Sequence, residues 1–428
     1  MNTIRDQYLS NVCQHIQAKD MHEDIRNELL THWDELVQDA LDNGCPRENV
    51  EALVLQQMGD PEEIGRSFNQ VHRPKMNWGL LITVGILVIL GIAVSYYSTI
   101  SLDYANLVAH KIFYSIIGLA IMLAVIFLDY RMLKKYSWVW FMLPFVIHAA
   151  VKPWIITMNG QELYLAIGSF SINLILAYSI LLLIGISGIL QQESTSKWRH
   201  SLSLMAITLL PLFLFSSANV KSYYLVYLVA LLAVLWKSLK SKVYFYIVTG
   251  LHTLVASLYI FMFSSRPATN RILSFLSQDE NYSFMLGRSR SAILSGGWWG
   301  QGIQDSSQEY PLIYSEYAIS YIFHSLGWII GALCLVVIGY VIVQFIRMSK
   351  QVKDNYGRTI ITGLAAYIGF QYVYNILMIF GLAPQAGISP PIISYGGTYS
   401  VLTLAIIGLM LSIYRRKDMI PHGVQVRE

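Results

Sequence analysis

Apolar residues recur at helical spacing in the first 73 residues, and longer, nearly continuous apolar runs follow from residue 77 to residue 417. In the first segment, two apolar faces are interrupted by charged residues. These faces consist of Ile25, Leu29, Leu30, Trp33 and Leu36, and of Val50, Leu53, Val54 and Met58. This period indicates amphipathic helices that pack on one another. The pattern predicts a small all-helical cytoplasmic domain over residues 1–73.

Two turn signals divide these predicted helices. Asn43 and Gly44 end the first apolar face, and Asp60 and Pro61 start a last helix as its N-cap and its first residue. With His32, this pattern resembles the small helical prefix domain found ahead of many permeases. The resemblance implies a docking or regulatory role, and a passive folding appendage is the alternative.

From Asn77 onward, about ten apolar runs are long enough to cross a membrane. The predicted spans are residues 77–97, 112–128, 136–156, 169–190, 200–217, 222–236, 243–264, 318–346, 359–380 and 397–414. The expected fold class is all-α: a polytopic membrane domain over residues 77–417, preceded by the small helical domain and followed by a tail over residues 418–428.

Composition supports the membrane assignment. The 428 residues are 55% hydrophobic and 13% charged, whereas soluble domains carry roughly 25% charged residues. The net charge of +4 is small and dispersed, which argues against nucleic acid as a partner. Cys13, Cys45 and Cys334 lack metal-ligand spacing, so neither a metal site nor a disulfide is expected. The polar start of the chain predicts no cleavable signal peptide.

Positive charges lie in alternate loops between the predicted spans, which is the pattern of cytoplasmic loops. These residues are Arg131, Lys134, Lys135, Lys197, Arg199, Lys237, Lys240, Lys242, Arg347, Lys350, Lys353, Arg358, Arg415, Arg416 and Lys417. We therefore expect a multi-pass protein of the plasma membrane with both termini in the cytoplasm. The loops expected outside are residues 98–111, 157–168, 217–221, 265–317 and 381–396.

The last of these outer loops has an unusual composition. Pro384, Pro390 and Pro391 donate no backbone hydrogen bond, and Gly396 and Gly397 are able to adopt conformations closed to other residues. Irregular backbone at membrane depth persists only where protein buries it or a water-filled cavity lies beside it. The stretch is therefore a site candidate, and a plain turn between two helices is the alternative.

The long outer loop, residues 265–317, exceeds the ~15 residues beyond which loops are usually functional or disordered. Trp298 and Trp299 suit a membrane interface, and arginine side chains suit a phosphate. The arginines of interest are Arg271, Arg288 and Arg290. An aromatic belt that touches lipid headgroups is the alternative interpretation.

Several blocks, in order and at matching separations, resemble the SEDS family (shape, elongation, division and sporulation; RodA, FtsW and SpoVE-like proteins). The blocks are residues 129–131, 159–160, 168–172, 289–302 and 387–398, together with Gln371 and Asn375. They extend over almost the whole chain after residue 77. Ten helices with both termini inside is the topology that the resemblance implies.

The resemblance also implies a function: polymerisation of glycan strands from lipid II, or another polyprenyl-diphosphate-linked sugar, beside a class B penicillin-binding protein. Alignment without gaps back from Gly327 places Glu316 where the family has its catalytic aspartate. A carboxylate at the membrane boundary suits a general base, while arginines or a bound divalent cation would stabilise the leaving diphosphate. A solvated loop acid, like Glu280 and Glu309, is the alternative for Glu316.

Residues of the matched blocks and of the long loop are the candidates for holding this substrate. They are Arg271, Arg288, Arg290, Ser295, Gly296, Gly297, Tyr164, Gln371, Asn375, Pro390, Ser394, Gly396, Gly397 and Thr398. Membrane lipids are the other expected partners.

The chain also departs from the family pattern. Residues 173–176 and 217–222 stand where the family has Gln-Pro-Ser-Glu and Gln-Pro-Asp-Leu-Gly-Thr, so two intramembrane acids are lost. Tyr164 replaces a tryptophan and Arg288 a glutamine. Because intramembrane charges are usually functional, two further hypotheses stay open: a non-catalytic scaffold or sensor in envelope assembly, and a flippase for lipid-linked precursors.

Overall fold

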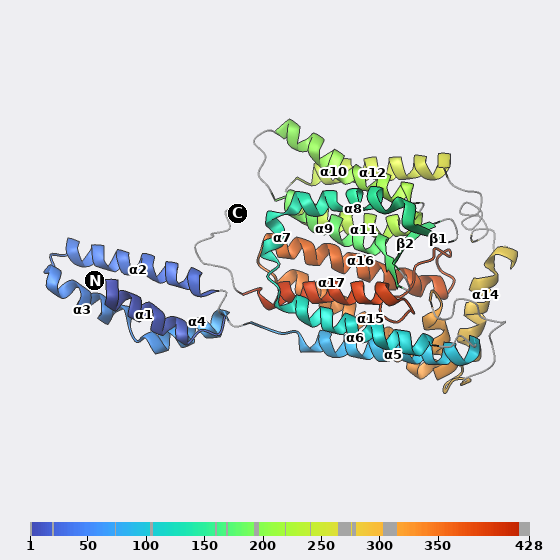
Figure 1. Cartoon of the computed structure of the whole chain (residues 1–428), viewed down its shortest axis with the longest axis horizontal. Helices are drawn as coiled ribbons and strands as arrows, with labels where there is room; N and C mark the ends of the chain where they lie inside the picture. The colour runs from blue at the N-terminus through green and yellow to red at the C-terminus, as the bar shows by residue number, and fades with distance from the viewer. Residues whose placement is uncertain are drawn as a thin grey trace. The chain divides into compact units, whose positions relative to one another are not determined.

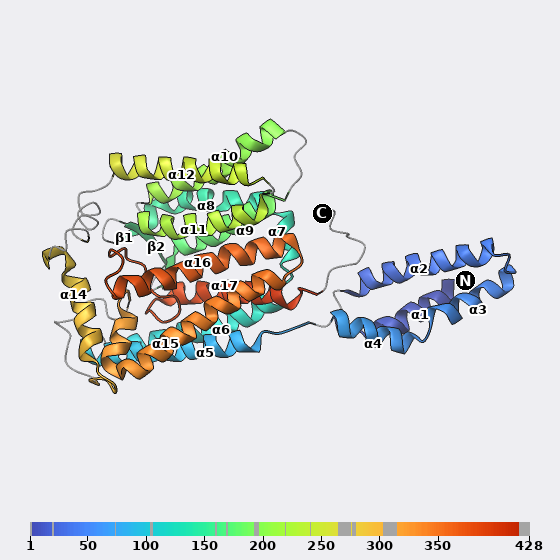
Figure 2. The ribbon, with the colours of Figure 1, turned by 180° about the vertical axis from the view of Figure 1, so that it is seen from behind.

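The structure is a computed structural model, shown from two sides in Figure 1 and Figure 2. It describes residues 2–18, 21–72, 74–102, 106–158, 161–167, 170–191, 197–218, 220–239, 241–263, 275, 280–302 and 315–418. The chain forms two compact units. One contains Met1–Asn77, Val352–Asp354 and Tyr414–Glu428, and the other contains Trp78–Gln351 and Asn355–Ile413.

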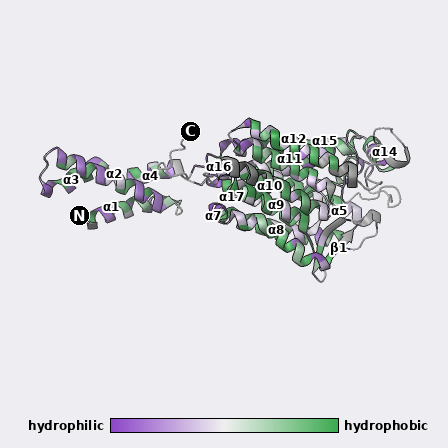
Figure 3. Cartoon of the chain, turned by 90° about the horizontal axis from the view of Figure 1, so that it is seen from above, coloured by the Kyte–Doolittle hydropathy of each residue, from purple (hydrophilic) through white to green (hydrophobic). Residues whose placement is uncertain are grey.

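The first unit is a group of four amphipathic helices. They are α1 (Asn2–Gln14), α2 (His22–Asp42), α3 (Arg47–Met58) and α4 (Pro61–His72). Hydrophilic residues predominate along these helices, whereas hydrophobic residues predominate along the helices of the second unit (Figure 3). The predicted apolar faces are confirmed, because Ile25, Leu29, Trp33, Val54 and Met58 are all buried.

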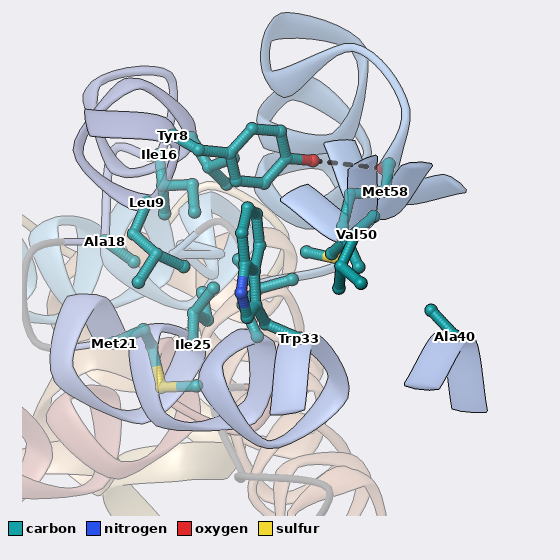
Figure 4. Packing of buried hydrophobic residues seen from close by; sticks show 13 residues of the cluster. Tyr8, Leu9, Ile16, Ala18, Met21, Ile25, Trp33, Ala40, Val50 and Met58 are labelled. Carbon is teal, nitrogen blue, oxygen red and sulfur yellow. Dashed lines mark hydrogen bonds between the residues drawn. The ribbon is translucent and has the colours of Figure 1, made fainter. Parts of the chain in front are cut away.

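The core of this unit is built around Trp33 (Figure 4). The centroids of the Tyr8 and Trp33 rings are 6.1 Å apart, and the Tyr8 hydroxyl donates a hydrogen bond of 3.0 Å to the carbonyl of Met58. Burial, and secondarily the negative charge of Asp60, raises the pKa of Tyr8. The phenol therefore stays protonated and joins α1 to the end of α3.

Both predicted turns are confirmed. Helix α2 ends at Asp42, and Gly44 adopts a φ of +78°. Asp60 caps α4, since its Oδ1 accepts a hydrogen bond of 3.2 Å from the backbone N–H of Glu62, and Pro61 is the first helical residue. The short helices are therefore ended by their own sequence and held together by the shared core.

Truncating the core of this unit is expected to destabilise it. Leu9 is 0% exposed, so Leu9→Ala removes buried methyl groups and leaves a cavity, at about 2–5 kcal/mol. Urea unfolding of residues 1–73, followed by the fluorescence of Trp33, measures the loss. Leu41→Ala, at a position 36% exposed, is the matched control. Equal losses in the two variants would contradict this packing.

The second unit contains a helix at each of the ten predicted spans. These are α5 (Trp78–Leu102), α6 (Leu107–Phe127), α8 (Ser137–Val151), α9 (Leu174–Ile189), α10 (Lys197–Ser217), α11 (Lys221–Ser238), α12 (Lys242–Phe263), α15 (Ala318–Gln351), α16 (Asn355–Ile379) and α17 (Gly397–Arg415). Within the described residues, five helices are long and apolar enough to cross a membrane: α5, α6, α15, α16 and α17. The chain is a helical membrane protein.

Two predicted span limits are wrong, because a small antiparallel sheet joins α8 to α9. After η2 (Lys152–Trp154), its strands are β1 (Ile155–Met158), β2 (Gln161–Ile167) and β3 (Phe170–Asn173), in the order β1-β2-β3. In β3, Phe170 and Ile172 alternate with Ser171, the period of a strand. Asn173 then caps α9 by accepting a hydrogen bond of 3.0 Å from Leu176 N.

The long predicted loop contains regular structure as well. Helix α14 (Glu280–Ser295) crosses the end of the bundle where β1 and β2 lie (Figure 1, Figure 2).

A short helix, α7 (Arg131–Lys135), follows α6, and the Asp129 carboxylate accepts a hydrogen bond of 2.9 Å from the Arg131 N–H. Helix α15 breaks at Gly327, which has a φ of +87°.

Candidate functional site

Residues 380–396, which we call the outer turn because the sequence predicts them on the outer face of the membrane, join α16 to α17. Three residues there have positive φ: Gly381 (73°), Gly387 (70°) and Ile392 (66°). Gly396 and Gly397 do not have positive φ. At Gly397 a side chain is excluded by lack of space, because a Cβ there would lie 2.5 Å from the Tyr114 ring.

Side chains of α16 hold the carbonyls of the outer turn. The Tyr374 hydroxyl donates to Pro384 O at 2.9 Å, and the Tyr372 hydroxyl donates to Pro391 O at 2.7 Å. Asn375 Nδ2 donates to Ile388 O at 2.8 Å. Because buried polar groups need partners, these bonds fix a turn whose own backbone is neither helix nor strand.

Asn375 also brings Glu316 to the outer turn. Its second Nδ2 proton goes to the backbone carbonyl of Glu316 at 2.8 Å. Glu316 lies in the turn just before α15, and its Oε1 is 3.6 Å from the place that a Cβ on Gly387 would occupy. The structure therefore places the predicted carboxylate, the predicted asparagine and the proline-rich turn side by side.

Removing this asparagine should loosen the arrangement. Asn375 is 0% exposed, so Asn375→Ala costs about 1–3 kcal/mol for each carbonyl that loses its donor. Tyr374→Phe removes a single hydrogen bond to the same turn and is the milder comparison. Thermal unfolding of the purified protein in detergent should show the larger decrease for Asn375→Ala, and a reversed order would refute the proposed linking role.

A second polar group ties β3 to the start of α17. The backbone N–H of Asn173 donates to Thr398 Oγ1 at 3.1 Å, and Thr398 Oγ1 donates to Ser171 O at 2.7 Å. Tyr164 shares a side-chain hydrogen bond with Asn173, and burial raises the pKa of Tyr164. Tyr164 and Thr398, predicted from separate blocks, thus meet at Asn173.

Tyrosines connect this group to Glu316. The Tyr223 phenol interacts electrostatically with Tyr164 and Glu316. The Tyr399 hydroxyl donates to Gln371 Oε1, and Gln371 Nε2 donates to Tyr367 O at 3.3 Å. The predicted Gln371 therefore belongs to a phenol-rich network, which offers neutral donors where an ionic site would offer charges.

The glycine-rich segment 295–302 packs against the break in α15. Gln301 N donates to His324 O at 2.8 Å, and Trp328 N donates to Gly297 O at 2.8 Å. A Cβ on Gly296 would lie 2.0 Å from Phe323 O. Close backbone packing accounts for Gly296, whereas Gly297, at φ +61°, has open space around it.

The predicted arginines are in different surroundings. Arg290 is exposed, and its Cδ lies 3.2 Å from the Cβ position of Gly381 in the outer turn. The Arg288 guanidinium lies 4.6 Å from the centre of the Phe284 ring. Between these two arginines in the sequence, Ser289 Oγ forms a hydrogen bond of 2.7 Å with Ser320 Oγ. Arg271 lies outside the described residues.

The other predicted residues contribute backbone or secondary contacts. Pro390 and Ser394 are buried within the outer turn. Gly396 packs near the Tyr399 side chain. Ser295 Oγ bonds to His324 Nδ1 at 2.9 Å. No group of three or more His, Cys, Asp or Glu side chains suited to a metal ion occurs in the part of the chain that the structure describes.

Sequence reasoning missed Lys111. The predicted span began at residue 112, but α6 begins at Leu107, and Lys111 is buried inside the unit at 1% exposure. The signal was available, because a lysine directly before an uncharged apolar run of this length can lie within the helix.

The comparisons with known proteins agree with this architecture. A sequence profile described as cell cycle protein, of FtsW, RodA and SpoVE, matches residues 72–419. A probable peptidoglycan glycosyltransferase FtsW of Trichlorobacter lovleyi is 28% identical over 150 residues, 33% of this chain and 39% of the relative. Stage V sporulation protein E of Bacillus subtilis is 30% identical over 151 residues, 34% and 41% of the two chains. The matches thus span about two fifths of these relatives.

Solved structures resemble the fold at lower identity. A chain of a peptidoglycan synthase complex that coordinates polymerization and crosslinking superposes with a TM-score of 0.67 at 19% identity, covering 80% of this chain and 98% of that one. The crystal structure of the rod shape determining protein RodA of Thermus thermophilus gives 0.60 at 19% identity, covering 80% and 97%. Since the family profile covers most of the sequence, this chain belongs to the FtsW/RodA/SpoVE family of cell cycle proteins.

Proposed function

We propose that this protein polymerises glycan strands from lipid II, or another polyprenyl-diphosphate-linked sugar, with Glu316 as general base. One observation carries the proposal: the Glu316 carboxyl lies beside Gly387, where Asn375 joins both segments. The relatives include proteins named as probable peptidoglycan glycosyltransferases, and these supply the reaction class.

The proposed chemistry needs few groups. A sugar hydroxyl attacks an anomeric carbon, the bond from that carbon to the diphosphate breaks, and the hydroxyl proton passes to the Glu316 carboxylate. A positioned base contributes roughly 10²–10⁴ in rate. Arg290, whose Cδ lies near Gly381 of the outer turn, is suited to bind the departing diphosphate through charged hydrogen bonds.

A divalent cation is part of the same proposal. Mg²⁺ is commonly bound by one or two carboxylates together with the phosphates of the substrate. Here Glu316 and the diphosphate oxygens would hold it, and the cation would stabilise the charge of the leaving group. Loss of polymer formation on addition of a chelator would support a role for the cation. Full activity in the presence of the chelator would leave Arg290 to stabilise the charge of the leaving diphosphate.

The partner and the orientation are proposals as well. We infer a class B penicillin-binding protein as partner, because one similar fold belongs to a peptidoglycan synthase complex. The basic loops favour a cytoplasmic position for both termini. In that orientation the outer turn faces the opposite side of the membrane, and the partner would act on that side.

A non-catalytic scaffold is the second candidate, favoured by one observation. Leu176 stands where the matched block has an acid, and it is 1% exposed within an apolar helix. The side chain at this position therefore carries no charge and lies in an apolar environment. A scaffold would bind partners without turning over a sugar.

The experiment is a polymerisation assay. The purified protein is mixed with lipid II in detergent, with and without a class B penicillin-binding protein whose transpeptidase is blocked. The expected product is uncrosslinked glycan polymer, separated by gel electrophoresis. Lipid II that is bound but left unpolymerised in both mixtures would favour the scaffold. Movement of labelled lipid across liposomes without polymer would favour the flippase.

A further inference from the structure

Lys111 of α6 places a buried ammonium group against the outer turn. Its Nζ donates to Ile392 O at 2.6 Å, to Ser394 O at 2.7 Å and to Ser400 Oγ at 3.1 Å. An ammonium group has three protons, so these contacts use all of them. The side chain is 1% exposed, and its acceptors belong to the turn and to the first residues of α17.

The backbone that Lys111 holds is in an unusual conformation. Ile392 has a φ of +66°, a region that β-branched residues rarely enter. Ile393 N donates to Pro391 O at 2.7 Å, so a γ-turn with positive φ closes around Ile392. Such backbone persists only where its surroundings determine it, and it occurs often at functional sites.

The surroundings do determine it, from three helices. Tyr372 of α16 holds Pro391 O at 2.7 Å, and Lys111 of α6 holds the next carbonyl. From α5, Gly91 leaves no space for movement: a Cβ there would lie 2.8 Å from Ile392 O and 3.1 Å from Lys111 Cε. The γ-turn is thus enclosed on each of these sides.

We propose that Lys111 is a positioning residue, whose ammonium keeps the outer turn in the strained conformation that sets Gly387 beside Glu316. An ionisable side chain within a membrane domain is costly and is usually retained for function. An apolar residue would pack in the same place but would leave the carbonyls of Ile392 and Ser394 without this donor. The effect on polymerisation rests on the proposed function, whereas the effect on the turn does not.

Hydrogen–deuterium exchange of the full-length protein in nanodiscs tests the turn directly. In Lys111→Met, peptides covering residues 388–396 should exchange at least about tenfold faster, because the charged hydrogen bonds are lost. Peptides from the middle of α16 should be unchanged, which distinguishes local loosening from general destabilisation. Met122→Ala, 3% exposed in the same helix, is the control and should leave the turn within about twofold of wild type.

A second variant covers the case in which Lys111→Met does not fold. Gly91→Ala keeps the ammonium but presses on Ile392 O from α5, so it should also speed exchange in residues 388–396. Unchanged exchange of the turn in the folded variant overturns the proposal. In the polymerisation assay, Lys111→Met should lower the rate with Glu316 intact. If the wild type forms no polymer, the proposed function fails while the exchange result still decides the role of Lys111.

Discussion

Replacing Glu316 by glutamine is expected to lower the rate of glycan polymerisation by about 10²–10⁴-fold. Glutamine keeps the size of the side chain and its place beside Gly387, but it cannot accept the proton of the attacking hydroxyl. The phenol-rich network and Arg290 are unchanged in this variant. The loss should therefore fall mainly on kcat, and a rise in KM would report the contribution of Glu316 to holding the cation and the diphosphate.

Two further variants sharpen this prediction. Glu316→Asp keeps the carboxylate and should retain more activity than Glu316→Gln. The resemblance implies an aspartate at this position in the family, so the shorter acid is expected to reach the hydroxyl. Glu280→Gln removes another acid from the same long segment and should leave the rate near that of wild type. If Glu316→Gln polymerises as fast as wild type, the role of general base is wrong.

The second large effect is expected at the glycine-rich segment, where Gly300→Ala should strongly destabilise the junction between α14 and α15. Gly300 has a φ of +84°, and a Cβ there would lie 2.3 Å from Ser325 O and 2.7 Å from Gly327 N. The positive φ alone costs about 1–3 kcal/mol. Overpacking against backbone that cannot yield adds about 1–3 kcal/mol or more.

Gly302→Ala is the matched control for this substitution. Gly302 has a φ of +70° but no neighbour within 4 Å of its Cβ position, so the alanine there adds backbone strain alone. Thermal unfolding of the two purified variants isolates the packing contribution, and Gly300→Ala should unfold at the lower temperature. If both variants lose the same stability, the glycine-rich segment 295–302 does not pack closely against the break in α15.

The helical part of the fold was predictable because its signals are local. Apolar runs of membrane length indicated a helix at each of ten positions, and Asp60 with Pro61 indicated a helix start. The sheet between α8 and α9 was not predicted, since the alternation of Phe170, Ser171 and Ile172 is too short to stand out beside the apolar run that follows. Helix α14 was not predicted either, because its sequence is largely polar and the helix is stabilised by packing against α15.

The candidate site was predictable only in part. Family blocks indicated Glu316, Asn375 and the proline-rich stretch, and the structure brings these three together. The predicted span began one residue after Lys111, so its place within the helix was missed. Its contacts could not be predicted, because its partners lie 281 and 283 residues away along the chain and no local pattern reports such a pairing. The conformation of Ile392 was missed for a similar reason: an isoleucine adopts positive φ only under tertiary constraint.

The central claim is that Glu316 and the outer turn perform their chemistry on the outer face of the membrane. The most direct measurement uses proteoliposomes in which every protein molecule has the same orientation and lipid II, which does not cross the bilayer unaided on the timescale of the assay, is supplied to one leaflet at a time. Polymer should form when lipid II is in the leaflet on the side of the outer turn, and none should form from the opposite leaflet. Polymer from the opposite leaflet alone would contradict the account.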